Sequence, residues 1–209
     1  FAPVLWNGKD PVLKERLFGL GNPEGNHGED LKDTMYHQAG TPTCCYAKAL
    51  YRYPQDRFPY ERLRDENQRR SRDETEFELV DTGIFSGNRF FDLDVEYAKV
   101  SPEDLLIRLT VTNQGPEAAD LHLLPSLWFR NTWDWGDENS AHPRIRLADG
   151  VVVSDALKEL ASYNLSCSEQ GTWLFTENET NTERLYNQPL RQPYVKDAFH
   201  RYLIEGQTD

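Results

Sequence analysis

Hydrophobic and polar residues alternate strictly over two stretches in the middle of the chain, and this alternation constrains the fold more than any other feature. Residues 91–97 place acidic residues between apolar ones, and residues 105–112 repeat the pattern with Leu, Ile and Val. Successive side chains of a β-strand point to opposite faces, so each stretch presents one apolar face and one polar face. The pattern predicts antiparallel strands with Phe91, Leu93, Val95 and Tyr97 buried and Asp92, Asp94 and Glu96 in water.

Shorter segments of the same kind follow along the chain, with turn signals between them. The turns are expected at 113–116, 149–150 and 170–171, where Asn, Gly, Pro and Asp gather. Successive short strands with such turns predict a mainly β chain, an antiparallel β-sandwich of two packed sheets over residues 77–176. The additional strands are expected at 119–129, 144–147, 151–153, 160–166 and 172–176.

Two short helices are expected near the N-terminal third, mainly within residues 41–70. Thr41 is a suitable N-cap and Pro42 suits the first helical position, so the first helix should run to about Tyr53. The second should start near Pro59 and carry many charged residues. Residues 1–40 are rich in Gly, Asn and Pro and are expected to form one short strand and ordered loops.

Charge and cysteine content exclude several classes of function. The formal net charge is -12, which disfavours nucleic acid and anionic membranes as partners. No apolar run reaches the ~18 residues that a membrane span needs. The cysteines are Cys44, Cys45 and Cys167, and an odd number containing an adjacent pair argues against a disulfide framework and favours the cytoplasm. No phosphate-binding, dinucleotide or C-x-x-C motif is present, so no cofactor is expected.

The segment at 15–30 contains the densest group of polar and glycine residues. Its candidates for a substrate-facing or domain-interface role are Asn26, His27, Glu29 and Asp30. Their spacing matches no zinc signature, so no metal site is expected. An acid/base cluster is one interpretation. A loop whose polar groups bond its own backbone is the commoner arrangement.

A second candidate segment lies at 126–136 and begins as a strand. Trp133 and Trp135 are two residues apart and share a face of an extended chain. With Arg130 and Asn131 they could bind a sugar, since rings stack on pyranoses and polar groups bond hydroxyls. Burial of one or both Trp in a core or a domain interface is the commoner use.

Long and specific motifs are spread over essentially the whole chain, at 5–8, 13–20, 23–30, 41–43, 51–55, 76–83, 95–99 and 123–136. Together these motifs resemble bacterial members of glycoside hydrolase family 63. One departure is Cys44-Cys45, where members of the family carry His-Ser after Thr-Pro-Thr.

The resemblance implies an inverting α-glucosidase acting on oligosaccharides, with a β-sandwich domain followed by an (α/α)6 barrel. Inversion uses two carboxyl groups about 6.5–9.5 Å apart, and in this family the barrel carries both. Such a barrel needs roughly 200 residues of helices and loops, which a chain made mostly of strands does not contain. Residues 1–209 are therefore expected to be an incomplete N-terminal domain, with no catalytic residue and with the barrel of the same polypeptide as partner.

Two other hypotheses remain open from the sequence. The chain could be a non-catalytic carbohydrate-binding module that uses Trp133 and Trp135. It could also be an independent enzyme that uses His27, Glu29 and Asp30.

Overall fold

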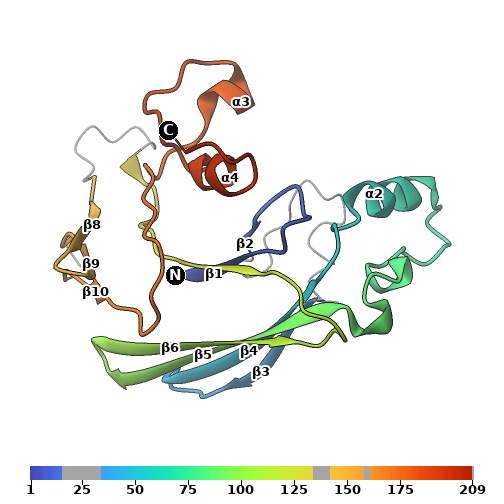
Figure 1. Ribbon diagram of the computed structural model, residues 1–209, viewed down its shortest axis with the longest axis horizontal. Coiled ribbons are helices and arrows are strands. Elements are labelled where there is room, and N and C mark those ends of the chain that lie inside the picture. The colour runs from blue at the N-terminus through green and yellow to red at the C-terminus, as the bar shows by residue number, and fades with distance from the viewer. Residues whose placement is uncertain (16–33, 134–141, 158–160, 209) are drawn as a thin grey trace. The chain divides into compact units, whose positions relative to one another are not determined.

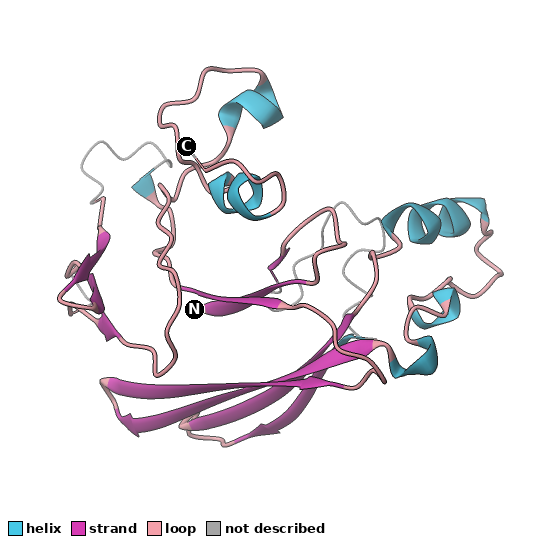
Figure 2. Cartoon of the chain, viewed as in Figure 1, coloured by secondary structure: helices cyan, strands magenta, loops and turns pink. Residues whose placement is uncertain are grey.

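The computed structural model describes residues 1–15, 34–133, 142–157 and 161–208. The chain divides into two compact units, one of Ala2–Pro125 and one of Phe1 with Ser126–Asp209. The first holds most of the strands (Figures 1 and 2).

The larger sheet of the Ala2–Pro125 unit has four strands, which follow one another in the order β3-β4-β5-β6. They are β3 (Met35–Gly40), β4 (Tyr46–Pro54), β5 (Phe90–Ser101) and β6 (Asp104–Asn113). Every neighbouring pair is antiparallel, and β4 and β5 stay in register over the full length of β4. The two alternating stretches of sequence therefore form adjacent strands, as expected.

A smaller sheet covers part of the inner face of the first. It has the order β2-β1-β7, with β1 (Ala2–Trp6), β2 (Lys14–Glu15) and β7 (His122–Ser126). Leu5 of β1 is fully buried in a cluster with residues from the central strands of the large sheet. This packing confirms the antiparallel β-sandwich. The other buried members of the cluster are Tyr51, Tyr53, Phe91, Leu93 and Val95.

The outer face of the large sheet carries a ladder of ion pairs across its strands. Lys48 lies 3.0 Å from Asp94, and Arg52 lies 3.0 Å from Asp92. Asp92 is buried rather than exposed, which differs from the expectation for this polar face. The reason is local: Arg52 and Gln114 both donate to its carboxylate and cover it.

The helix expected over 41–53 is wrong, because these residues form a turn and then β4. The Thr41 hydroxyl accepts hydrogen bonds from the backbone N–H groups of Cys45 and Tyr46, both at 3.1 Å, and so closes a turn. β4 is flanked by β3 on one side and β5 on the other. Pairing on both edges and burial of Tyr51 and Tyr53 override the local helix signals.

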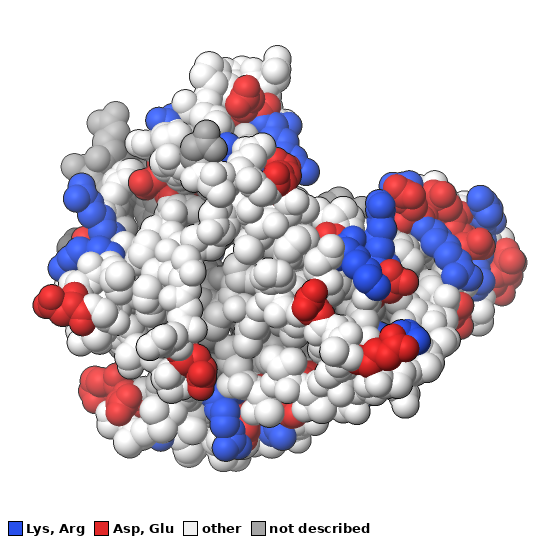
Figure 3. Space-filling view, viewed as in Figure 1, with Lys and Arg blue, Asp and Glu red and all other residues white. Residues whose placement is uncertain are grey.

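The second helix, α2 (Tyr60–Arg69), is confirmed, and acidic and basic side chains gather over it (Figure 3). Its buried Leu63 packs with Phe58 and with residues of the following segment. The period-two pattern was expected to begin as a strand at residue 77, and this is wrong. Phe77 and Leu79 are buried against α2 instead, and the chain forms the 3-10 turns η1 (Val80–Thr82) and η2 (Ser86–Asn88).

The second unit contains a small antiparallel sheet of the order β10-β9-β8. Its strands are β8 (Ile145–Ala148), β9 (Val151–Ser154) and β10 (Asn164–Leu165). Asp149 and Gly150 have φ of 50° and 80°, the left-handed pair that a two-residue type I′ hairpin requires, and this confirms the turn expected there.

The rest of this unit departs from the sequence-based expectation. No strand forms at 172–176, and Trp173 and Phe175 are 39% and 45% exposed, because no neighbouring strand buries them. Two short helices appear outside the range expected for helices, α3 (Thr182–Tyr186) and α4 (Ala198–Leu203). No helix in the described part of the chain is long and apolar enough to cross a membrane.

Candidate functional site

A groove of about 930 Å³ lies at one end of the Ala2–Pro125 sandwich. Four connections line it: the loop after β1, the loop from β4 to α2, the η1–η2 segment, and the loop from β6 to β7. Loops held by a rigid sheet are the usual place for binding residues. The volume lies in the range of ligand sites, which is ~300–1,000 Å³.

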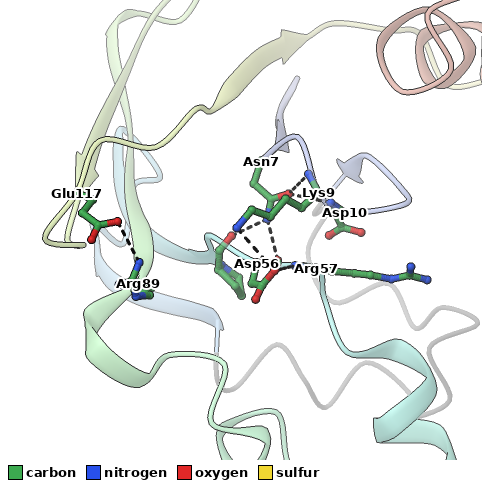
Figure 4. A network of polar contacts seen from close by, with 8 residues as sticks. Asn7, Lys9, Asp10, Asp56, Arg57, Arg89 and Glu117 are labelled. Carbon is green, nitrogen blue, oxygen red and sulfur yellow. Dashed lines mark hydrogen bonds and ion pairs between the residues drawn. The ribbon is translucent and has the colours of Figure 1, made fainter.

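Asn7 holds two of these connections together. Its amide nitrogen donates to the carbonyl oxygens of Pro54 and Asp56, at 2.8 and 2.9 Å. Its amide oxygen accepts from the backbone N–H groups of Lys9 and Asp10, both at 2.9 Å. The side chain is 5% exposed, so all of its bonding capacity fixes the loop after β1 against the loop after β4 (Figure 4).

Asp10 fixes the same loop through its buried carboxylate. Its carboxylate accepts from the hydroxyls of Tyr53 at 3.2 Å and Tyr60 at 3.0 Å. Burial raises the pKa of Asp10, against the opposing charge of Lys14. Lys14 is itself buried, with its ammonium 3.5 Å from the centre of the Phe58 ring. Asp10 is 2% exposed and cannot reach a substrate, so this network positions the loop rather than doing chemistry.

The rim of the groove carries charges of both signs. Lys9 lies 3.7 Å from Asp56, and Arg89 lies 3.6 Å from Glu117 (Figure 4). Both pairs are long and well exposed, and pairs of this kind contribute little to stability. Arg62 donates to the carbonyl oxygen of Thr82 at 2.9 Å, which ties α2 to the η1 turn.

Trp6 and His122 supply the aromatic part of the groove. Their ring centres are 5.0 Å apart and the rings are tilted by 39°. The indole N–H of Trp6 donates to the carbonyl oxygen of Asp10 at 2.8 Å, which fixes the ring. His122 is exposed on β7.

Five of the residues singled out in the sequence lie outside the described residues. The structure therefore leaves their roles, and the alternative enzyme built on three of them, as predictions. They are Asn26, His27, Glu29, Asp30 and Trp135.

The other three candidates lie in the Ser126–Asp209 unit. Asn131 donates to the carbonyl oxygen of Asn178 at 2.8 Å, and Asn178 donates back to that of Phe129, so Asn131 joins two segments of irregular backbone. Trp133 is half-buried, with its ring 5.3 Å from that of His142. Arg130 is exposed. The pairing of Trp133 with Trp135 on a sugar stays a prediction.

The turn before β4 contains two consecutive cysteines, Cys44 and Cys45, and both are exposed. Cys44 adopts φ of 53°, and Cys45 Sγ lies 2.7 Å from the Thr43 hydroxyl and 3.4 Å from that of Thr41. These hydrogen bonds lower the pKa of Cys45. This turn replaces the start of the helix that was expected over 41–53.

Sequence reasoning missed most of the groove. Trp6, Asn7 and Gln55 belonged to segments matched by resemblance, but Arg57, Arg89 and His122 come from three separate places in the sequence and no local motif connects them. Among the described residues, no group of three or more His, Cys, Asp or Glu side chains could hold a metal ion. The groove is suited to binding by stacking and hydrogen bonding.

Fold and site together define a mainly β chain with a loop-framed polar groove. No profile of a known protein family matches the chain, and no solved structure matches it. The sequence is similar to "Uncharacterized protein YMR196W" of Saccharomyces cerevisiae, with 37% identity over 241 aligned residues. The alignment covers 99% of this chain and 22% of the yeast protein, so the chain spans about a fifth of that relative.

Proposed function

We propose that this chain is the N-terminal β domain of a glycoside hydrolase similar to the inverting α-glucosidases of family 63. In this proposal the domain supports an (α/α)6 barrel elsewhere in the same polypeptide, and the barrel carries the catalytic carboxylates. The long motifs given above motivate the family, and the β-sandwich is compatible with it. A location in the cytoplasm of a bacterium belongs to the same proposal, and the three free, exposed thiols suit a reducing compartment.

The structural observation that supports the packing part of the proposal is the exposed inner face of β6. Val111 pairs with Leu93, and Leu105 pairs with Lys99 beyond Tyr97, so both residues point to the same face as the buried core. Leu93 is fully buried, whereas Val111 is 40% and Leu105 is 48% exposed. An apolar sheet face of this kind favours further protein packed on it.

The length of the yeast relative supports the view that the rest of the polypeptide packs on this face of β6. A protein of which this chain matches 22% has room for a second large domain. Oligosaccharide is then the substrate of the whole protein.

The packing part of the proposal is tested with Leu105→Ser. In a longer polypeptide that includes this chain, the change should lower the free energy of unfolding by about 1–3 kcal/mol, because a buried apolar side chain is lost. In residues 1–209 alone it should change stability by less than about 0.5 kcal/mol. Leu147→Ser on β8, where the side chain is 45% exposed, is the matched control. Equal effects of Leu105→Ser in both chains would contradict the proposal.

A further inference from the structure

The groove at the end of the Ala2–Pro125 sandwich combines a fixed aromatic surface with a polar rim. The Asn7 and Asp10 networks hold its loops before any ligand arrives. Binding to a site formed in advance costs less conformational entropy than binding to a loose one. The shape of the groove is therefore set before any ligand binds.

The aromatic surface sets the shape of that ligand. The N–H edge of Trp6 is turned to the backbone of Asp10, which leaves the carbon surface of the indole to line the groove beside the exposed ring of His122. An indole face suits the C–H face of a pyranose ring, which packs against an aromatic ring while the hydroxyls remain at its edge.

The charges on the rim favour a neutral ligand over an anionic one. Four basic side chains and three acidic ones line the groove. Lys9 and Arg89 are each offset by a carboxylate, so a phosphate or a uronate would meet a nearly balanced surface. Hydroxyl groups both donate and accept, and they match alternating carboxylates and guanidinium groups. Among the described residues, Asp120 has no hydrogen-bond or ion-pair partner and can accept from a hydroxyl.

We propose that this groove binds a neutral oligosaccharide, with one sugar ring on Trp6 and His122 and its hydroxyls bonded to Arg89, Glu117 and Asp120. The described residues that line this groove do not include Trp133. It extends the proposed function, and only the choice of glucose-based probes rests on that function. Because two long, weak ion pairs form the rim, their side chains can turn to the ligand at small cost.

The test is a titration of the ¹⁵N-labelled 209-residue chain with neutral trisaccharides, namely maltotriose, isomaltotriose, nigerotriose and cellotriose, followed by NMR. Inorganic phosphate is the anionic probe. At least one trisaccharide should shift the amide signals of residues 6–9 and 117–122, with a dissociation constant on the order of 1 mM. Phosphate should leave them unchanged. Shifts with phosphate alone, or with none of the sugars, would overturn the inference.

Variants place the sugar in the groove. Trp6→Ala should weaken binding by about tenfold, which is the scale of one lost stacking contact. Glu117→Gln and His122→Ala change exposed side chains and should weaken it by about three- to tenfold without affecting the fold. Trp173→Ala removes a partly exposed Trp from the other unit and should leave affinity unchanged. Equal binding by wild type, Glu117→Gln and His122→Ala would also overturn the inference.

These experiments distinguish a failure of the groove proposal from a failure of the proposed function. Sugar binding by the 209-residue chain needs no hydrolysis, so it can be present in a protein that is not a glucosidase. Conversely, a longer polypeptide that hydrolyses α-glucosides while this groove binds no sugar would refute the groove alone.

Discussion

Replacing Asn7 by Ala should destabilise the Ala2–Pro125 unit more than its small loss of volume implies. The change removes four hydrogen bonds to backbone groups of two different loops. The carbonyl of Pro54 and the N–H of Asp10 lie in buried bonds, and leaving each without a partner costs about 1–3 kcal/mol. The groups of Asp56 and Lys9 are reached by water and cost about 0.5–1 kcal/mol each. With some relaxation of the loops, a loss of about 3–5 kcal/mol is expected.

Asn67→Ala is the matched control, because Asn67 makes two bonds of the same kind to Phe77, both partly buried. Its expected loss is about 1–2 kcal/mol. Hydrogen exchange of peptides from β4 and β5, measured by mass spectrometry, reports the stability of this unit without contributions from the other. If Asn7→Ala costs no more than Asn67→Ala, Asn7 does not hold the two loops and the preformed groove is refuted.

Three further predictions concern the core and two titrating groups. Leu93→Ala should cost about 2–5 kcal/mol in the same exchange experiment, since Leu93 is fully buried between the sheets, and a loss below about 1 kcal/mol would contradict that packing. Cys45 should be alkylated by iodoacetamide faster than Cys167 at neutral pH, because its lowered pKa gives more thiolate. Thr43→Val should slow the alkylation of Cys45. Mass spectrometry of the labelled peptides measures both rates. Burial raises the pKa of Asp10 above the unfolded value of about 3.9. This group therefore adds stability below that pH, and the contribution is lost as the pH rises through the folded pKa. A ¹³C titration of the Asp10 carboxyl that gives a lowered pKa would refute this.

Alternation predicted the central strands well because apolar residues at every second position specify which face of a strand is buried. Phe91, Leu93 and Val95 are buried where the pattern required it. The same reasoning was wrong for residues 41–53, where Thr41 and Pro42 resemble a helix start. Only the pairing of β4 with strands on both sides, which is a long-range property, makes that segment a strand.

The groove was harder to foresee than the fold, for a related reason. Its charged residues come from loops far apart in sequence, and Arg89 meets Glu117 only because β5 and β6 lie side by side. The candidates chosen from local density of polar residues lay elsewhere in the chain. Asn7 gave a signal only through the matched segment around Trp6, and two of its four hydrogen bonds go to a loop about fifty residues away.

The most direct test of the proposed function is ¹H NMR of sugar products from two purified proteins, residues 1–209 and a longer polypeptide that includes them. The longer protein should hydrolyse neutral α-linked glucose oligosaccharides and release the β-anomer first, as inversion requires. Residues 1–209 should release none. Hydrolysis by residues 1–209 alone, lost on Glu29→Ala or Asp30→Ala, would contradict the account, as would a longer protein that releases the α-anomer first.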